Sequence, residues 1–123
     1  MVTKKAIDNL IKKLKLPEYD KFSQDWEYEV ANIERLEEFI EYYQNVDMDI
    51  DEKFTLMIII LESCNDAKQE NKLQKETWDK VEELLIKDKI IHDSTINYWS
   101  CIENENIEDC FYITPLVRKL NKG

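Results

Sequence analysis

The single histidine, His92, is the first candidate for a catalytic group, because Asp93 follows it and the chain also contains serine and cysteine nucleophiles. A catalytic Cys–His or Ser–His pair requires both side chains within hydrogen-bonding reach. Consecutive residues such as His92 and Asp93 do not face each other on a helix, and the sequence marks no nucleophile as their partner. We therefore interpret His92–Thr95 as the start of a helix, and we predict that the protein is not an enzyme.

A metal site needs clustered ligands, and the sequence offers one partial pattern of this kind. The run Asp47-x-Asp49-x-Asp51 matches the first half of a calcium-binding loop. It lacks the central glycine of such a loop, and its twelfth position is Ile58 instead of glutamate. One histidine and three dispersed cysteines also lack the ligand spacing of a zinc site. We expect neither a metal nor any other cofactor.

The cysteines bear on the redox environment of the protein. Cys64, Cys101 and Cys110 are odd in number and include no C-x-x-C pair. The segment Met1–Leu16 is amphipathic and contains lysines, without the long apolar core of a signal peptide. These features favour a cytoplasmic protein with three reduced, buried thiols over the alternative of a Cys101–Cys110 disulfide.

Glycine is nearly missing from the chain, since the only one is Gly123. Nucleotide-binding P-loops, dinucleotide-binding G-x-G-x-x-G turns and nucleophile elbows all need internal glycines, so these sites are excluded. The Asn-Gly and Asp-Gly turns typical of β-hairpins are absent too. A large antiparallel sheet is therefore not expected.

Acidic residues outnumber basic ones, and the imbalance is concentrated in one segment. The net charge of the chain is −10. Residues 1–24 carry +3 and residues 53–123 carry −3, whereas residues 25–52 hold eleven acids against Arg35 alone and carry −10. Such a surface repels the phosphate backbone of nucleic acids. A basic protein surface is the complementary partner.

Part of this acidic segment is expected to form one face of a helix. Carboxylates three and four positions apart repel each other, and most protein surfaces mix the two signs of charge. The segment is therefore interpreted as a binding surface, although a solvated helix face is the alternative. Tyr42 lies at the edge of the face, and a ring beside carboxylates is common at interfaces. The candidate partner-binding residues are Glu34, Glu37, Glu38, Glu41, Tyr42, Asp47, Asp49 and Asp51.

The longest apolar run, Phe54–Leu61, marks the element around which the rest of the chain is expected to pack. It is far shorter than the ~20 residues that cross a bilayer. Its β-branched residues would also suit a strand, but Asp49 and Glu52 have the spacing of a capping box. We predict a helix over Asp49–Asp66 that is apolar nearly all round and covered on several sides.

The remaining elements follow from apolar spacing and capping residues. Trp26–Val30 alternates apolar and polar residues and is predicted to be extended, with a first helical turn as the alternative. Aromatic residues such as Tyr98 and Tyr112 are expected in the core. Further helices are predicted over Lys4–Lys15, Ile33–Gln44 and Glu76–Lys87, around Ile96–Ile102, and after an N-cap at Thr114. The predicted fold is all-α: a single domain, residues 1–123, with five or six helices around the central helix and one short extended segment.

A small acidic chain of this helical character, with its acids in the run Glu34–Asp51 and no catalytic constellation, resembles bacterial toxin-immunity proteins. These include the cognate inhibitors of contact-dependent-inhibition and colicin-type toxins. The resemblance covers the character of the whole chain and involves no diagnostic motif. It implies a protein that covers the active site or the nucleic-acid surface of a basic toxin domain.

The sequence therefore predicts a cytoplasmic, non-enzymatic immunity protein that binds a basic toxin domain through its acidic surface. We expect no nucleic-acid partner and no membrane partner. The first alternative is a helical adaptor or regulatory subunit. The second alternative, from a different class, is a small enzyme that uses some of its many carboxylates.

Overall fold

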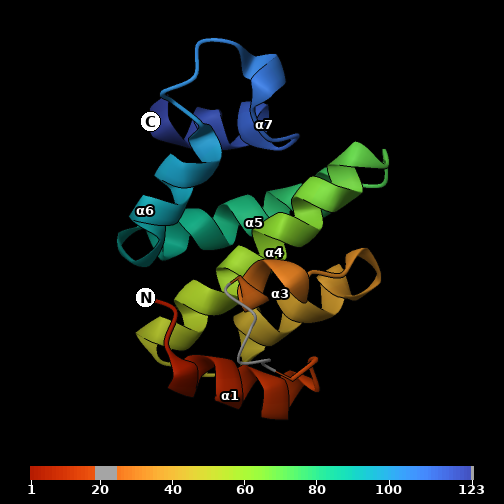
Figure 1. Cartoon of the computed structure of the whole chain (residues 1–123), viewed down its shortest axis with the longest axis vertical. Coiled ribbons are helices and arrows are strands. Elements are labelled where there is room, and N and C mark those ends of the chain that lie inside the picture. The colour runs from red at the N-terminus through yellow and green to blue at the C-terminus, as the bar shows by residue number, and fades with distance from the viewer. Residues whose placement is uncertain (19–24, 123) are drawn as a thin grey trace. The chain divides into compact units, whose positions relative to one another are not determined.

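Helices form the secondary structure of the residues that the computed structural model describes, 1–18 and 25–122 (Figure 1). This part of the chain contains no β-strand, so the predicted all-α class is confirmed. It contains seven α-helices, the helix over Ile50–Gln69 and six others, which agrees with the predicted five or six helices besides the central one. The α-helices are α1 (Lys4–Leu14), α2 (Trp26–Glu29), α3 (Leu36–Asn45), α4 (Ile50–Gln69), α5 (Lys75–Lys87), α6 (Lys89–Ser100) and α7 (Thr114–Arg118). The 3-10 helices are η1 (Ile33–Arg35), η2 (Ile107–Asp109) and η3 (Lys119–Lys122).

By its internal contacts the chain divides into two units, unit 1 (Met1–Ser63) and unit 2 (Cys64–Gly123). The boundary falls inside α4, which continues through it as one helix. The single domain expected from the sequence stays a prediction.

The helix predicted over Asp49–Asp66 is confirmed as α4 and extends to Gln69. Asp49 caps it, because its Oδ1 accepts a hydrogen bond of 2.8 Å from the Glu52 N–H. Every residue from Thr55 to Leu61 is buried. Seven consecutive residues point to all sides of a helix, so this part of α4 is covered all round, as its apolar run predicted.

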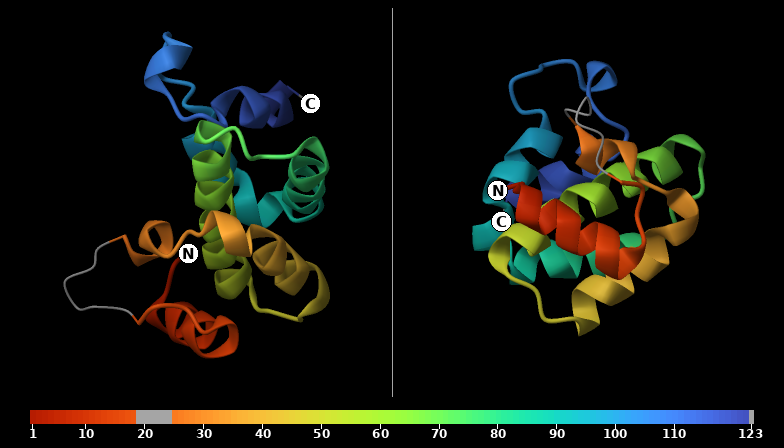
Figure 2. Two further views of the ribbon diagram at one scale, coloured as in Figure 1. Left: turned by 90° about the vertical axis from the view of Figure 1, so that its right-hand side faces the viewer. Right: turned by 60° about the horizontal axis from the view of Figure 1, so that its bottom comes forward.

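In unit 1, α1 lies beside the first part of α4 in both views of Figure 2. Thr3 caps α1, its Oγ1 accepting from the Ala6 N–H at 3.1 Å. Asn9 of α1 donates to Glu52 of α4 at 3.2 Å, which ties the polar edge of one helix to the other. The apolar side of α1 is buried: Ala6, Ile7, Leu10 and Leu14.

The prediction of an extended Trp26–Val30 is wrong, since Trp26–Glu29 forms α2 with Val30 as its C-cap. Trp26 and Val30 are both buried, and residues four apart lie on the same face of a helix. The Trp26 indole N–H also donates to the Pro17 carbonyl at 2.8 Å. The two buried residues are therefore those that helical spacing selects, and the alternation with period two was coincidental.

In unit 2, α5 agrees with its prediction, but α6 begins earlier than expected, at Lys89. The cluster His92–Thr95 therefore lies inside α6 and does not start it. His92 and Thr95 are buried on the same side as Ile96. The apolar spacing of Ile96 onward indicated this helix but not the turn that precedes it.

Thr114 does not cap α7 in the predicted way, because Ile113 occupies the N-cap position. The buried Thr114 hydroxyl instead donates to the Trp99 carbonyl of α6 at 2.9 Å and accepts from the Phe111 N–H at 3.1 Å. The Ile113 N–H donates to Asn65, at the end of α4, at 3.1 Å. These bonds fix α7 within unit 2.

Three helices end without glycine. Lys15, Asn71 and Cys101 take left-handed backbone conformations, with φ of 53°, 58° and 52°, after α1, α4 and α6 respectively. Left-handed residues are common helix terminators, and glycine is the usual one. A chain with glycine only at position 123 must use side-chain-bearing residues there.

None of the helices in the described part of the chain is long and apolar enough to cross a bilayer.

Candidate functional site

The acidic candidates lie on η1, α3, the 46–49 connection and the start of α4, all in unit 1. Their carboxylates reach solvent, and only Asp51 is half-buried. The exposed set is Glu34, Glu37, Glu38, Glu41, Asp47 and Asp49. The predicted face therefore exists as a run of exposed acids along one helix and its two ends.

Some of these carboxylates already have partners. Glu38 forms a bidentate ion pair with Arg35, with both N–O distances at 2.8 Å, and the bond from Arg35 lowers the pKa of Glu38. Asp49 caps α4, and Asp51 lies 3.4 Å from the N-terminal amine of Met1. A carboxylate that is already paired attracts a cationic partner less strongly.

Glu34, Glu41 and Asp47 are the acids of this set whose side chains form neither an ion pair nor a hydrogen bond within residues 1–18 and 25–122. Glu34 lies in η1 and Glu41 in α3, on either side of the paired Glu38. These three positions carry the charge that remains available to a partner.

Arg35 has a structural role that charge counting did not reveal. Its guanidinium donates to the carbonyl of Leu14 at 2.5 Å and to that of Lys15 at 3.5 Å. These carbonyls belong to the C-terminal end of α1, where the helix leaves acceptors without intrahelical partners. The guanidinium also lies 5.1 Å from the centre of the Phe39 ring. Arg35 therefore joins α1 to α3 while it neutralises Glu38.

Tyr42 lies at the edge of the buried side of α3, as predicted, and is half-buried. Burial raises the pKa of its hydroxyl, and the charge of Glu52 raises it further. The sequence placed Tyr42 next to Glu38 and Glu41, whereas the carboxylate that acts on its hydroxyl is Glu52, on α4. Tertiary packing supplies that neighbour.

The expectation of three free thiols is wrong for two of them. Cys101 and Cys110 form a disulfide, with Cα atoms 6.0 Å apart, whereas Cys64 is free and buried. Cys101 ends α6 in a left-handed conformation, which turns the chain so that residue 110 can return to it. The prediction of free thiols used the odd number of cysteines, which does not indicate whether the chain turns back to bring two of them together.

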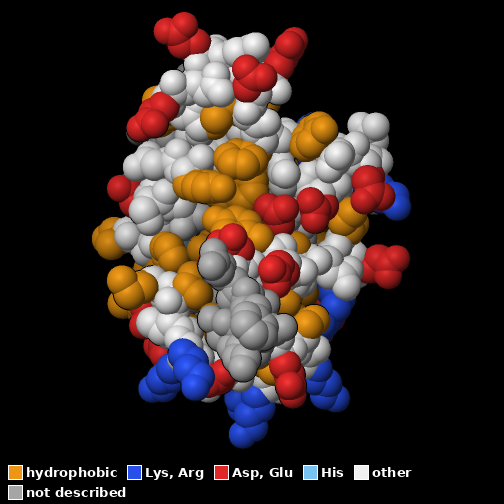
Figure 3. All heavy atoms as spheres, in the orientation of Figure 1, with side chains coloured by type: hydrophobic (Ala, Val, Ile, Leu, Met, Phe, Trp, Pro, Cys, Tyr) orange, Lys and Arg blue, Asp and Glu red, His pale blue; other side chains and the backbone are white. Residues whose placement is uncertain are grey.

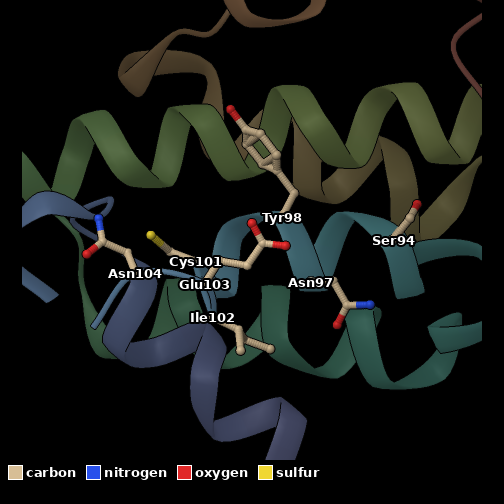
Figure 4. Close-up of a pocket in the computed structure, with 7 residues that line it drawn as sticks. All are labelled: Ser94, Asn97, Tyr98, Cys101, Ile102, Glu103 and Asn104. Atoms are coloured by element: carbon tan, nitrogen blue, oxygen red, sulfur yellow. The ribbon is translucent and has the colours of Figure 1, made fainter. Parts of the chain in front are cut away.

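The end of α6 holds a groove that the sequence did not predict. It is about 820 Å³ in volume and is lined by residues of the C-terminal half of α6 and by residues 101–104 (Figure 4). Tyr98 and Ile102 line it and are 49% and 63% exposed. The prediction that Tyr98 and Tyr112 belong to the core is wrong, since Tyr112 is also 52% exposed. Trp99 and Ile96 fill the inner side of α6 instead.

His92 is fully buried within α6. In residues 1–18 and 25–122, no three side chains of His, Cys, Asp or Glu are grouped so that they could hold a metal ion.

Comparison with protein-family models, with curated proteins and with solved structures finds no match for this chain. Function must therefore be argued from the chemistry of its surfaces. The two surfaces with distinct chemistry are the acidic positions of unit 1 and the groove at the end of α6.

Proposed function

We propose that this chain is a non-enzymatic binding protein, and specifically an immunity protein that neutralises a cognate basic toxin domain through the acidic surface of unit 1. The observation that carries the proposal is the exposure of Glu34, Glu41 and Asp47 without an ion pair among the described residues. Negative surface charges that have no ion-pair partner attract a positively charged protein surface.

The acidic surface would act mainly on the rate of association. Long-range attraction between opposite charges raises association rates at low ionic strength, and salt removes it. The Debye length falls from ~30 Å at 0.01 M salt to ~8 Å at 0.15 M. A basic toxin domain should therefore bind fast at low salt and more slowly as the salt concentration rises.

The test is a binding titration against a basic toxin domain encoded next to this gene. The double reversal Glu34→Lys with Glu41→Lys should lower the association rate at least about tenfold at low salt, because each change removes one unpaired negative charge and adds a positive one. Both side chains are exposed, so the fold should persist. The matched control is Lys12→Glu on the exposed side of α1, which should do little harm. Association at the wild-type rate by the double reversal would leave the acidic face as a solvated surface.

Tyr42 offers a second readout with a different kinetic signature. A half-buried ring at the edge of an interface contributes by contact and desolvation, so Tyr42→Ala should raise the dissociation rate more than it lowers the association rate. A circular dichroism spectrum equal to that of the wild type serves as the folding control. An unchanged dissociation rate would place the interface away from Tyr42.

We propose the cytoplasm, where an immunity protein would meet an incoming toxin, as the compartment of this chain. The Cys101–Cys110 disulfide weighs against this assignment, because such bonds are rare in the reducing cytosol. Alkylation of thiols before cell lysis, followed by mass spectrometry, distinguishes reduced from disulfide-bonded cysteines. Alkylated Cys101 and Cys110 would support the cytoplasm, and their protection would contradict it.

A further inference from the structure

The groove at the end of α6, which we call the α6 groove, combines a carboxylate with apolar walls. In Figure 4 the Glu103 carboxylate lies centrally among the labelled residues, with Asn97 and Ser94 to one side and Cys101 and Asn104 to the other. Tyr98 and Ile102 supply exposed apolar surface. Exposed apolar surface bordered by polar groups is typical of interaction sites.

The chain segment that forms the groove and its flanks carries acidic side chains, and the basic residue beside it is Arg118, which bonds to its backbone. From Ile90 to Val117 the chain has five acids and neither lysine nor arginine. Its one histidine, His92, is fully buried. Glu103 forms no ion pair with any residue in the described ranges. In Figure 3 the acidic side chains gather over the 103–109 segment, and hydrophobic side chains lie beneath them over the end of α6. The acids are Asp93, Glu103, Glu105, Glu108 and Asp109.

The wall of the groove is firmly held. The Arg118 guanidinium donates to the carbonyls of Ser100, Cys101 and Asn104 at 2.7, 2.9 and 3.3 Å. The Cys101–Cys110 disulfide closes the same segment into a loop. A rigid surface loses little conformational entropy when a ligand binds to it. Because Arg118 is directed at carbonyl oxygens, it does not neutralise Glu103.

We propose that the α6 groove docks a segment of a partner protein in which a lysine or arginine is flanked by apolar side chains. Charge complementarity selects this occupant, because the groove offers an unpaired carboxylate in an acidic surface and two exposed apolar residues. The cationic head pairs with Glu103, and its apolar stem packs beside exposed parts of the Tyr98 side chain. The apolar neighbours of that cation cover Ile102. This docking surface belongs to unit 2 and does not depend on the acidic surface of unit 1 or on the immunity function.

The test uses two synthetic peptides that differ in charge alone. Each has alternating leucines, one with lysines between them and one with glutamines in their place. Both are titrated into the full-length, disulfide-bonded protein labelled with ¹⁵N, and amide shifts are followed by NMR. The lysine peptide should give saturable shifts centred on residues 94–104, and the glutamine peptide should bind at least about tenfold more weakly, since a central charged contact contributes on this scale.

Variants separate the groove from general electrostatic attraction. Glu103→Gln and Ile102→Ser should each weaken binding of the lysine peptide by about five- to tenfold. The matched control is Glu105→Gln, which removes a charge from the same exposed loop but does not line the groove. It should weaken binding less than about twofold, as substitutions at an interface rim do.

Three outcomes would overturn the proposal. Equal losses in Glu103→Gln and Glu105→Gln would show attraction to a diffuse acidic surface without a docking site. Equal binding of both peptides would remove the charge argument. Shifts centred on α3 instead of residues 94–104 would assign peptide binding to unit 1. All variants alter exposed residues. Each should therefore give an amide spectrum similar to that of the wild type, which would confirm that it is folded.

Discussion

Each unit contains a helix that ends in a left-handed residue and is closed by an arginine from farther along the chain. In unit 1, α1 ends at Lys15, and Arg35 donates to the carbonyls of Leu14 and Lys15. In unit 2, α6 ends at Cys101, and Arg118 donates to carbonyls around that residue. A guanidinium suits this position, because the carbonyl end of a helix carries partial negative charge.

The two arginines differ in what else they bind. Arg35 also forms a bidentate ion pair with Glu38. The arginine that closes α1 therefore neutralises one carboxylate of the acidic surface. Among the described residues, Arg118 bonds to the three carbonyl oxygens given above. It also lies 3.9 Å from the sulfur of Cys110. Arg118 therefore forms no ion pair with the acids of the 103–109 segment. The arginine that closes the helix therefore neutralises one surface carboxylate in unit 1. In unit 2 the corresponding arginine neutralises none.

Exposed apolar side chains lie beside acids in both units. On α3 the large apolar residues Phe39, Ile40 and Tyr43 are buried, whereas Val46 and Ile50, next to the acids that follow α3, are exposed. At the end of α6, Tyr98 and Ile102 are exposed beside the acids. Interfaces combine a buried apolar centre with a polar rim. Both units therefore have both components, and those of unit 2 line a groove.

The largest expected effect comes from substitutions of core leucines, which test whether the interiors of the two units are equally well packed. Leu61 in unit 1 and Leu85 in unit 2 are both fully buried. Leu61→Ala and Leu85→Ala should each lower the free energy of unfolding by ~2–5 kcal/mol, as buried large-to-small changes do. Urea unfolding followed by circular dichroism measures both. A silent Leu85→Ala would mean that the interior of unit 2 is packed less tightly than that of unit 1.

The second test removes the disulfide, for which unit 1 has no counterpart among its described residues. Closing a loop of this length stabilises a protein by about 2–3 kcal/mol in the chain-entropy account. The double variant Cys101→Ser with Cys110→Ser should lose that amount in a thermal or urea unfolding curve. Reducing agent should destabilise the wild type to the same level and leave the double variant unchanged. A wild type insensitive to reduction would contradict a stabilising role for the bond.

The third test compares the two arginines directly. Arg118→Met should cost about 2–3 kcal/mol of unfolding free energy, because it leaves several partly buried carbonyls without a charged donor. Arg35→Met should cost less, about 1–2 kcal/mol, because part of its bonding is an exposed ion pair with Glu38. Matched urea unfolding curves give both values. If Arg35→Met were the more harmful change, the contrast between the two helix ends would be reversed.

The smallest effect concerns the pH dependence of the Arg35–Glu38 pair. Because the bond from Arg35 lowers the pKa of Glu38 in the folded protein, the pair stabilises the fold above the pKa of an unfolded glutamate. This contribution is lost as the pH falls through the lowered folded-state pKa. Glu38→Gln should therefore be less stable than wild type at neutral pH, by less than about 1 kcal/mol since the pair is exposed. The difference should vanish in acid. A difference that persists at low pH would exclude the ion pair as its cause.

Features that depend on a few neighbouring residues could be predicted from the sequence. The caps at Thr3 and Asp49 and the buried run within α4 all follow from residue types at fixed short spacings. The exposure of Glu34, Glu37, Glu38 and Glu41 also agrees with prediction, because helical periodicity alone places them on one side.

Features that depend on distant residues could not be predicted in this way. The Cys101–Cys110 disulfide requires the turn that follows α6, and the bond of Arg35 to the end of α1 joins positions 21 residues apart. The exposure of Tyr98 and Ile102 depends on which side of α6 is already filled by Trp99 and Ile96. The α6 groove is built from these features, so no pattern in the sequence indicated it.

The continuity of α4 across Ser63 has a consequence for how this chain could have arisen or could be re-engineered. Severing the chain after Ser63 would deprive backbone groups on both sides of their partners within the helix. The short piece Cys64–Gln69 would then have to start a helix alone, which is unfavourable for so few residues. Recombination or circular permutation should therefore keep residues 50–69 together and be tolerated better in the connection around residues 70–74. The two units are not interchangeable modules, because they share one inseparable segment.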